Sequence, residues 1–415
     1  MPTAPRRKRL LIGVAAIAVA LLGALGVLGL GLVRGWFDSG SVTGSTVGFE
    51  PRAAPRADEP PGSWPEYGYN AQRTRANPAL RALRPPYRRA WAYPAGSLVE
   101  FSPVIADGRA IFGTNHRLAV ALDLATGRHL WTRRVRGRIA SSPAIAGRLA
   151  LFTTTAGEVV AFDAATGRTV WERRLGAAVE SSPLVIGRSF YIGTLGRQVV
   201  RMAVATGRIE WRAEAPGEVK ASLAQDGDRV VVGDYAGHIT AYAQRDGRVV
   251  WRRESPGTRL GGAGRFYAGP AVAYGRIYLG NINGRMLALN ARDGSTAWVR
   301  VLDDYIYASA AVANRMVYVG SYNHHFYALD AVTGAVRWSF DAGERISGSA
   351  TVIGDVVYVS TIGRRPEDGR TFMLDARTGE RLAAFPDGRY SPAVAADARL
   401  LVLTGVNTVY GLTPR

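Results

Sequence analysis

Tryptophan recurs along this chain at an almost constant spacing. The intervals between successive repeat tryptophans are 40, 40, 40, 40, 47 and 40 residues. These tryptophans are Trp91, Trp131, Trp171, Trp211, Trp251, Trp298 and Trp338. Each of them, after the first, closes a stretch that resembles residues 121–131, Ala-Leu-Asp-Leu-Ala-Thr-Gly-Arg-His-Leu-Trp. A fixed period of this size means that one supersecondary unit is repeated, and that repeat determines the fold.

Each repeat predicts four short strands separated by glycine turns. In the unit that ends at Trp171, apolar runs cover residues 139–145, 149–154, 158–163 and 169–175. Four short strands in about 40 residues are typical of a propeller blade. The tryptophan offers a large apolar face, and its N–H needs an acceptor. We therefore expect the seven repeat tryptophans to dock neighbouring blades.

The number of repeats predicts eight blades and the way in which the ring closes. Complete units end at Trp131, Trp171, Trp211, Trp251, Trp298, Trp338 and Ala383. The C-terminus then supplies three strands, at 390–395, 400–404 and 408–412, and the missing fourth is residues 87–93. Closure of this kind removes exposed sheet edges. The fold class is thus all-β, an eight-bladed propeller over residues 63–415 with N-to-C strand closure, preceded by one transmembrane helix.

The repeat resembles a known family. The pattern Ala-x-Asp-x-x-Thr-Gly-x-x-x-Trp, the eight blades and the lead-in Trp64-Pro-Glu-Tyr-Gly68 are similar to the pyrroloquinoline-quinone (PQQ)-type β-propeller family. That family includes quinoprotein dehydrogenases and the propeller lipoprotein of the outer-membrane barrel-assembly machinery, so the resemblance implies a fold and not one activity. We expect the lead-in, residues 63–86, to pack across the propeller with a short helix near 78–83.

The N-terminus has the pattern of a membrane anchor. Residues 1–9 form a basic tail with Arg6, Arg7, Lys8 and Arg9, and residues 10–33 then run 24 positions without a charge. This exceeds the roughly 20 apolar residues that span a bilayer. The charge asymmetry predicts a cytoplasmic N-terminus and an extracytoplasmic propeller at the cell membrane. A long cleaved signal peptide is the alternative. Residues 34–62, rich in Gly, Ser and Pro, read as a flexible linker.

The amino-acid composition limits the kinds of partner that we expect for this chain. The chain has no cysteine, which separates it from the lipoprotein branch of the family, and its net charge is +19. Arginine supplies 50 of the 52 basic residues, a bias that resembles a coding preference. We therefore expect no nucleic-acid partner. The expected partners are the membrane, through residues 10–33, and a protein or cell-envelope ligand.

One end of the channel is the candidate binding face. The first strand of each blade contains a Ser-Pro dipeptide or residues equivalent to it. We aligned the eight strands on this dipeptide and took the residue two positions before its serine. Most of these residues are charged or aromatic, and period 2 predicts that they face one way. The two insertions, at 255–265 and 362–370, fall on the same end, and the matching loops of other blades add Tyr322. The candidate residues are Glu100, Glu180, Lys220, Tyr267, Tyr307, Tyr322 and Arg389.

A catalytic function is a weaker hypothesis than a binding function. By resemblance, a PQQ- and Ca²⁺-dependent dehydrogenase needs a carboxylate base and a Glu/Asn/Asp calcium site, which Glu100 or Glu180 with Asn281 would imitate only in part. Lys220 and Arg389 at the same mouth disfavour a cation site. We expect a non-catalytic binding or scaffold module without metal or cofactor. The alternatives are the quinoprotein dehydrogenase, with PQQ and Ca²⁺, and an envelope assembly factor.

Overall fold

The computed structural model describes residues 46–51, 62–257, 262–363, 368–391 and 393–415. The predicted tail and transmembrane segment, residues 1–33, lie outside these ranges. None of the described residues belongs to a helix long and apolar enough to cross a membrane. The description below concerns the compact unit formed by Ser41–Pro256 and Ala263–Arg415.

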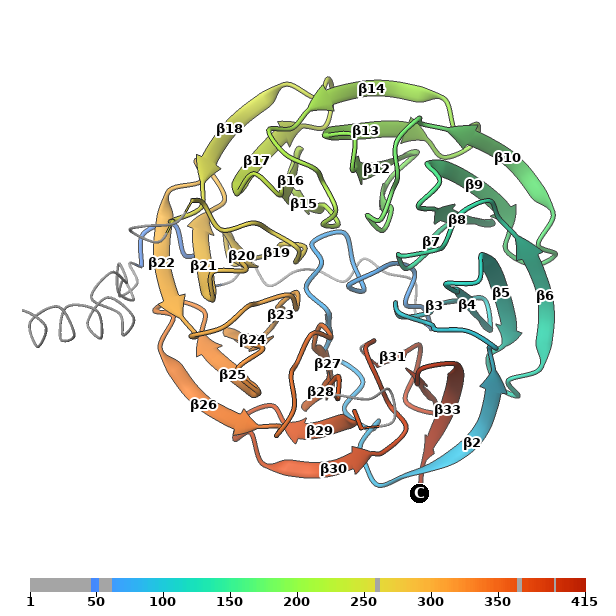
Figure 1. Ribbon diagram of the computed structural model, residues 1–415. Coiled ribbons are helices and arrows are strands. Elements are labelled where there is room, and N and C mark those ends of the chain that lie inside the picture. The colour runs from blue at the N-terminus through green and yellow to red at the C-terminus, as the bar shows by residue number, and fades with distance from the viewer. Residues whose placement is uncertain (1–45, 52–61, 258–261, 364–367, 392) are drawn as a thin grey trace, which may run out of the picture. The chain divides into compact units, whose positions relative to one another are not determined.

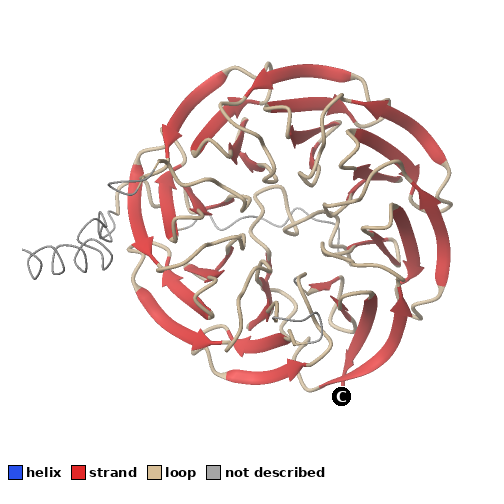
Figure 2. Cartoon of the chain, in the orientation of Figure 1, coloured by secondary structure: helices blue, strands red, loops and turns tan. Residues whose placement is uncertain are grey.

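This unit is a ring of eight antiparallel sheets, as predicted (Figure 1). No helix occurs among the described residues, so the short helix expected near 78–83 was wrong, and turns take its place (Figure 2). The innermost strands are β3 (Val104–Ala106), β7 (Ala144–Ala146), β11 (Leu184–Ile186), β15 (Ala224–Asp226), β19 (Ala271–Ala273), β23 (Ala311–Ala313), β27 (Thr351–Ile353) and β31 (Val394–Ala395). The second strands are β4 (Arg109–Gly113), β8 (Leu149–Thr153), β12 (Ser189–Thr194), β16 (Arg229–Gly233), β20 (Arg276–Gly280), β24 (Met316–Gly320), β28 (Val356–Ser360) and β32 (Leu401–Thr404).

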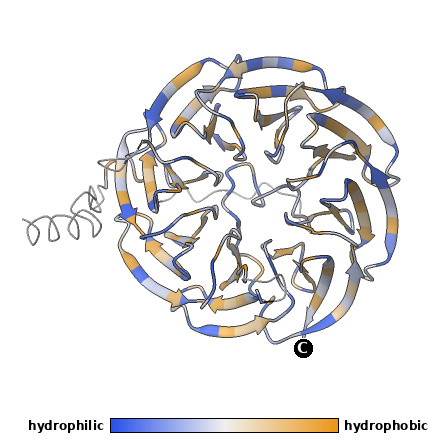
Figure 3. Ribbon diagram, viewed as in Figure 1, coloured by the Kyte–Doolittle hydropathy of each residue, from blue (hydrophilic) through white to orange (hydrophobic). Residues whose placement is uncertain are grey.

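The outer half of each sheet is longer and more polar. The third strands are β5 (Leu118–Asp123), β9 (Glu158–Asp163), β13 (Gln198–Ala203), β17 (His238–Ala243), β21 (Arg285–Asn290), β25 (His325–Asp330), β29 (Thr371–Asp375) and β33 (Thr408–Pro414). The outermost strands are β6 (His129–Arg134), β10 (Thr169–Arg174), β14 (Ile209–Glu214), β18 (Val249–Glu254), β22 (Thr296–Val301), β26 (Val336–Asp341), β30 (Arg381–Phe385) and β2 (Tyr87–Pro94). Polar and apolar residues alternate along this rim (Figure 3).

Strand β2 closes the ring, as the repeat count predicted. It pairs antiparallel with β33, from Tyr87 opposite Pro414 to Pro94 opposite Thr408. Figure 1 shows β2, in cyan, on the outside of β33, in red. The two ends of the propeller meet where the Arg415 N–H donates to the Pro86 carbonyl at 3.0 Å. The eighth blade therefore has four strands, and β33 is covered by β2 instead of forming the edge of its sheet.

The core lies between neighbouring sheets, and the repeat tryptophans join them. One cluster, for example, combines Val104, Ile111 and Trp131 of the first blade with Phe152 and Val160 of the second. Each tryptophan N–H donates to a backbone carbonyl of the next blade at 2.9–3.2 Å. The seven donor–acceptor pairs are Trp91–Leu124, Trp131–Ala164, Trp171–Val204, Trp211–Gln244, Trp251–Ala291, Trp298–Ala331 and Trp338–Ala376.

The same indole rings lie against the Thr-Gly or Asp-Gly turn of the next blade. A Cβ atom added at Gly207, for instance, would lie 2.5 Å from the Trp171 ring. The eighth blade lacks this turn, because its two outer strands come from opposite ends of the chain. Position 383 on the seventh blade, which would face that turn, holds alanine instead of tryptophan. A blade thus carries the tryptophan where the next blade has the glycine turn, and lacks it where the next blade has no such turn.

The lead-in closes one end of the channel. Figure 1 shows it, in blue, crossing the centre of the ring. The inner strands of successive blades hydrogen-bond to it through their middle residues, at 2.7–2.9 Å in each backbone bond. These bonds link Ile105 to Trp64, Ile145 to Pro65, Gln225 to Ala71, Val272 to Gln72, Val312 to Thr74 and Val352 to Arg75. Strand β1 (Ala76–Asn77) then pairs parallel with β27. Packing across the propeller was expected, but its contact with nearly every blade was not.

A short part of the predicted linker also contacts the propeller. The Glu50 N–H donates to the Tyr274 carbonyl at 2.9 Å, and the Phe49 ring stacks on Tyr274 with centroids 5.4 Å apart. The guanidinium groups of Arg276 and Arg315 lie 5.2 and 5.5 Å from the centroid of the same ring. These contacts involve Tyr274 and Arg276 at the β19–β20 turn of the fifth blade and Arg315 in the β23–β24 turn of the sixth.

Candidate functional site

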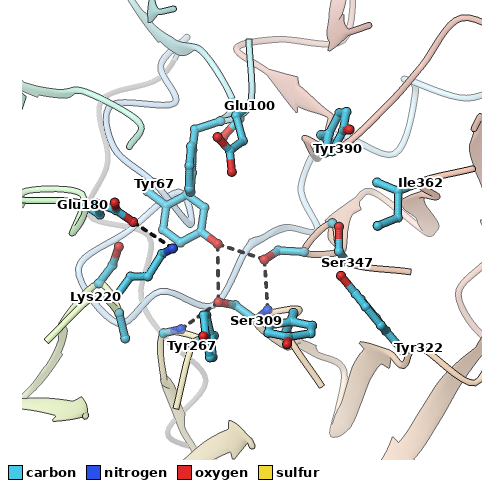
Figure 4. A pocket seen from close by; sticks show the side chains of 18 residues that line it. Tyr67, Glu100, Glu180, Lys220, Tyr267, Ser309, Tyr322, Ser347, Ile362 and Tyr390 are labelled. Atoms are coloured by element: carbon cyan, nitrogen blue, oxygen red, sulfur yellow. Dashed lines mark hydrogen bonds and ion pairs between the residues drawn. The ribbon is translucent and has the colours of Figure 1, made fainter. Parts of the chain in front are cut away.

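A blind cavity opens at the end of the channel opposite the turns that follow the inner strands. Its volume is about 340 Å³. The lining comes from the segments that precede the inner strands and from the loops between second and third strands, and both kinds of connection emerge at this end. Below, the cavity ends on Tyr67 of the lead-in (Figure 4). We call this cavity the mouth pocket.

A ring of serines supports the pocket. The Ser142 N–H donates to the Ser182 hydroxyl at 3.0 Å, and the Ser182 N–H donates to the Ser222 hydroxyl at 3.1 Å. On the other side of the channel, the Ser309 N–H donates to the Ser349 hydroxyl at 2.9 Å. Each bond joins one blade to the next across an interval of 40 residues. The Ser-Pro step of the repeat is therefore an inter-blade hydrogen-bonding position, a role that the sequence analysis missed although the spacing was visible.

Six of the eight register positions line the pocket: Glu100, Glu180, Lys220, Tyr267, Tyr307 and Ser347. Tyr322, expected from the loop after β24, lines it too. The inner strands are shorter than predicted, so these residues precede the strands, and the serine ring holds their segments in equivalent positions. These residues do line one pocket, but the alternation of side chains along a strand, from which their common direction was predicted, is not the reason.

Arg389 does not line the pocket. Its side chain is buried, and its guanidinium donates to the carbonyls of Pro386 and Gly388. Its neighbour Tyr390, which has a positive φ of 53°, lines the cavity instead. Arg389 thus stabilises the turn into the eighth blade. Asn281 is also absent from the pocket lining, because it is buried. Its side-chain oxygen accepts hydrogen bonds from the backbone N–H groups of Asn283 and Arg285, and its side-chain NH₂ donates one to the Ser255 hydroxyl.

Tyrosines form a continuous arc along one side of the pocket. Successive ring centroids are 4.5 Å apart for Tyr235–Tyr267, 4.8 Å for Tyr267–Tyr307 and 4.7 Å for Tyr307–Tyr322. Tyr305, 47% exposed, extends the arc outward and lies 5.7 Å from Tyr307. Burial raises the pKa of Tyr307 and of Tyr322, so both phenols are neutral at physiological pH and can donate hydrogen bonds.

Charged side chains complete the lining. The Lys220 ammonium lies 2.8 Å from a Glu180 carboxylate oxygen and 5.4 Å from the centroid of Tyr267. Glu100 enters from the first blade (Figure 4). Within the described part of the chain, the Glu100 carboxylate has neither an ion-pair partner nor a hydrogen-bond donor. The pocket therefore combines one neutralised ion pair, one uncompensated carboxylate and an aromatic wall.

The pocket floor is held by hydrogen bonds and lies against a buried guanidinium. The Tyr67 hydroxyl lies 2.8 Å from the Ser349 hydroxyl and 3.3 Å from that of Ser309. The Arg75 guanidinium lies 4.5 Å from the Tyr67 ring centroid. Burial raises the pKa of Tyr67, but the Arg75 charge and the two serine hydrogen bonds outweigh it, and the net pKa lies below the usual value. Arg73, fully buried beneath, pairs with Glu66 at 3.0 Å.

Comparison with known proteins places the chain in a family. The family model described as outer membrane protein assembly factor BamB matches residues 80–186, 155–306 and 306–413. The chain belongs to this family of PQQ-like propeller repeats. No curated protein matches the chain significantly.

Solved structures share the fold. BamB from Moraxella catarrhalis superposes with a TM-score of 0.66 at 17% identity, covering 79% of this chain and 100% of that one. The quinohemoprotein alcohol dehydrogenase from Comamonas testosteroni gives 0.71 at 16% identity, covering 85% and 80%. A europium-containing methanol dehydrogenase gives 0.72 at 14% identity, covering 86% and 99%. Identities this low establish the architecture, whereas activity depends on the residues of the site itself.

Proposed function

We propose that this protein is a membrane-anchored, extracytoplasmic binding module that holds a protein or cell-envelope ligand at the mouth pocket. The observation that carries the proposal is the blind pocket with its tyrosine arc. The floor is closed by Tyr67, so a ligand enters from one side only. Concave sites with an aromatic wall and a few convergent polar groups are typical binding sites.

The anchor is part of the proposal. Residues 10–33 are long and apolar enough to span a bilayer, and the basic tail before them favours a cytoplasmic N-terminus. The family description, which names an outer-membrane protein assembly factor, supports a protein partner in the cell envelope. An assembly role is therefore the more specific form of the same proposal.

The lining does not fit a PQQ and Ca²⁺ site. Lys220 is the one cationic residue that lines the pocket in the described part of the chain, and it is already paired with Glu180. A quinone that bears several carboxylates would meet the uncompensated Glu100 carboxylate there, and like charges repel. The described residues also contain no group of three or more His, Cys, Asp or Glu side chains that could hold a metal ion. This donor set favours binding without redox chemistry.

Site-specific photo-crosslinking in intact cells tests the proposal. A photoreactive phenylalanine replaces Tyr305 at the mouth, and the matched control carries it at Arg188, in the exposed turn between β11 and β12 at the other end of the channel. The proposal predicts specific adducts from position 305 that decrease when Tyr307 is replaced by Ala. Adducts from position 188 only, or the same adducts from both positions, would contradict it.

A further inference from the structure

We infer that the mouth pocket recognises a cationic group, the ammonium or guanidinium of an isolated lysine or arginine side chain on a partner segment. This inference rests on the proposed function and adds the chemistry of the ligand. It follows from three observations: the uncompensated Glu100 carboxylate, the faces of the tyrosine arc, and the way in which the pocket already holds its own cations.

The pocket contains an internal example of the proposed recognition. The Lys220 ammonium is held between the Glu180 carboxylate, at 2.8 Å, and the Tyr267 ring, 5.4 Å from its centroid. At the far end of the arc, the Arg345 guanidinium lies 5.7 Å from the Tyr322 centroid. Cations within about 6 Å of an aromatic centroid are attracted by the ring quadrupole. Tyr267 and Tyr322, the two neighbours of Tyr307 in the arc, therefore already attract cations.

Lys220, paired with Glu180, is the one cationic residue that lines the pocket in the described part of the chain, and Arg75 is buried against the Tyr67 ring. Tyr307 lies in the arc between the two ends, and Glu100 enters the same cavity from the first blade. A carboxylate in a partly closed cavity is stabilised by a charge-assisted donor. A ligand ammonium that enters from the open side would supply that donor to Glu100 and its charge to the tyrosine face. An anionic ligand would instead be repelled by Glu100.

The segments around the pocket carry charges of both signs. Glu218, Asp303 and Asp304 precede inner strands on the side of the pocket where the tyrosines lie, and so do Arg265 and Arg345. The net charge of the whole chain is +19. A strongly basic protein would be repelled by that charge at long range, whereas a flexible segment with one cationic side chain would be repelled much less. The pocket therefore fits a single lysine or arginine and not a basic surface.

The test is a titration of the full-length chain with four blocked tripeptides, Gly-X-Gly, in which X is arginine, lysine, citrulline or glutamate. The protein contains 3-fluorotyrosine, and fluorine NMR follows the resonances of Tyr267 and Tyr307, assigned through their Phe variants. We expect saturable shifts from the arginine and lysine peptides only. Glu100→Gln should weaken their binding about tenfold, the loss expected for one charge-assisted hydrogen bond.

The matched control is Glu254→Gln, which removes the same charge from the exposed strand β18 and should leave the titration unchanged. Equal shifts from the citrulline peptide, or unchanged binding in Glu100→Gln, would overturn the cationic ligand. The absence of any shift would overturn it as well. The crosslinking at position 305 is a separate measurement: mouth adducts would persist if only the ligand chemistry is wrong, and would be missing if the binding function is wrong.

Discussion

A methyl group added at Gly207 tests whether the repeat tryptophan docks one blade on the next. Gly207 lies in the turn between β13 and β14 with φ of +64°, and a Cβ there would lie 2.5 Å from the Trp171 ring. Gly187, in the turn between β11 and β12, has φ of +59°, and a Cβ there meets nothing within 4 Å. The two glycines thus share a backbone conformation and differ in their contact with tryptophan.

The expected costs follow from this difference. Alanine in the left-handed region costs about 1–2 kcal/mol, and Gly187→Ala should lose only that amount of unfolding free energy. Gly207→Ala should lose a further 1–3 kcal/mol or so, because the methyl group overpacks the indole ring. Trp171→Ala should itself cost about 3–5 kcal/mol, since it removes the packing and the 2.9 Å hydrogen bond to Val204.

Equilibrium urea denaturation of the full chain, followed by tryptophan fluorescence, measures these changes. In the Trp171→Ala background, the cost of Gly207→Ala should fall to that of Gly187→Ala, because the ring that it contacts is gone. The docking account would be refuted if Gly207→Ala and Gly187→Ala cost the same in the natural sequence, or if the cost of Gly207→Ala did not depend on Trp171.

Three further predictions concern the lead-in and the ring. Glu66→Gln should destabilise the fold by about 3–5 kcal/mol because it leaves the buried Arg73 charge without its carboxylate, whereas Arg84→Ala, at an exposed pair, should cost less than about 1 kcal/mol; thermal and urea denaturation compare the two. Burial raises the pKa of Tyr87 to about 12, so the unfolded chain loses that proton first, and stability should fall from about pH 10 to pH 12. Tyr87→Phe should make this decline shallower by at most about 1.4 kcal/mol per pH unit in pH-dependent denaturation, and an unchanged slope would contradict the assignment. Ser182→Ala should cost about 1–3 kcal/mol, because the buried Ser142 N–H loses its acceptor; hydrogen exchange at Ser142 should then accelerate, and unchanged protection would count against the serine ring.

The fold could be predicted almost completely from the spacing of the tryptophans. A period of 40 residues with four apolar runs specifies a blade, and a unit divided between Tyr87–Pro94 and the C-terminus specifies how the ring closes. These features are local or periodic, so a single sequence displays them. The closure of the channel by the lead-in was harder to predict, because residues 63–77 contain no repeat and form hydrogen bonds with inner strands far along the chain.

The site could be predicted only in part. Register alone identified six residues that line the pocket, because equivalent positions in a repeat occupy equivalent places. It could not show which way a side chain turns, and Arg389 turns toward the carbonyls of its own loop. It also could not show that Tyr67 closes the channel, since the lead-in lies outside the repeat. Positions that depart from the repeat need coordinates before a role can be argued.

The most direct test of the mouth as the functional site is the crosslinking yield at position 305 in intact cells, compared with position 188. The account predicts a specific adduct at 305 that decreases when Tyr307 is replaced by Ala and is absent at 188. An adduct that forms only at 188, or one at 305 that is indifferent to Tyr307, would contradict it.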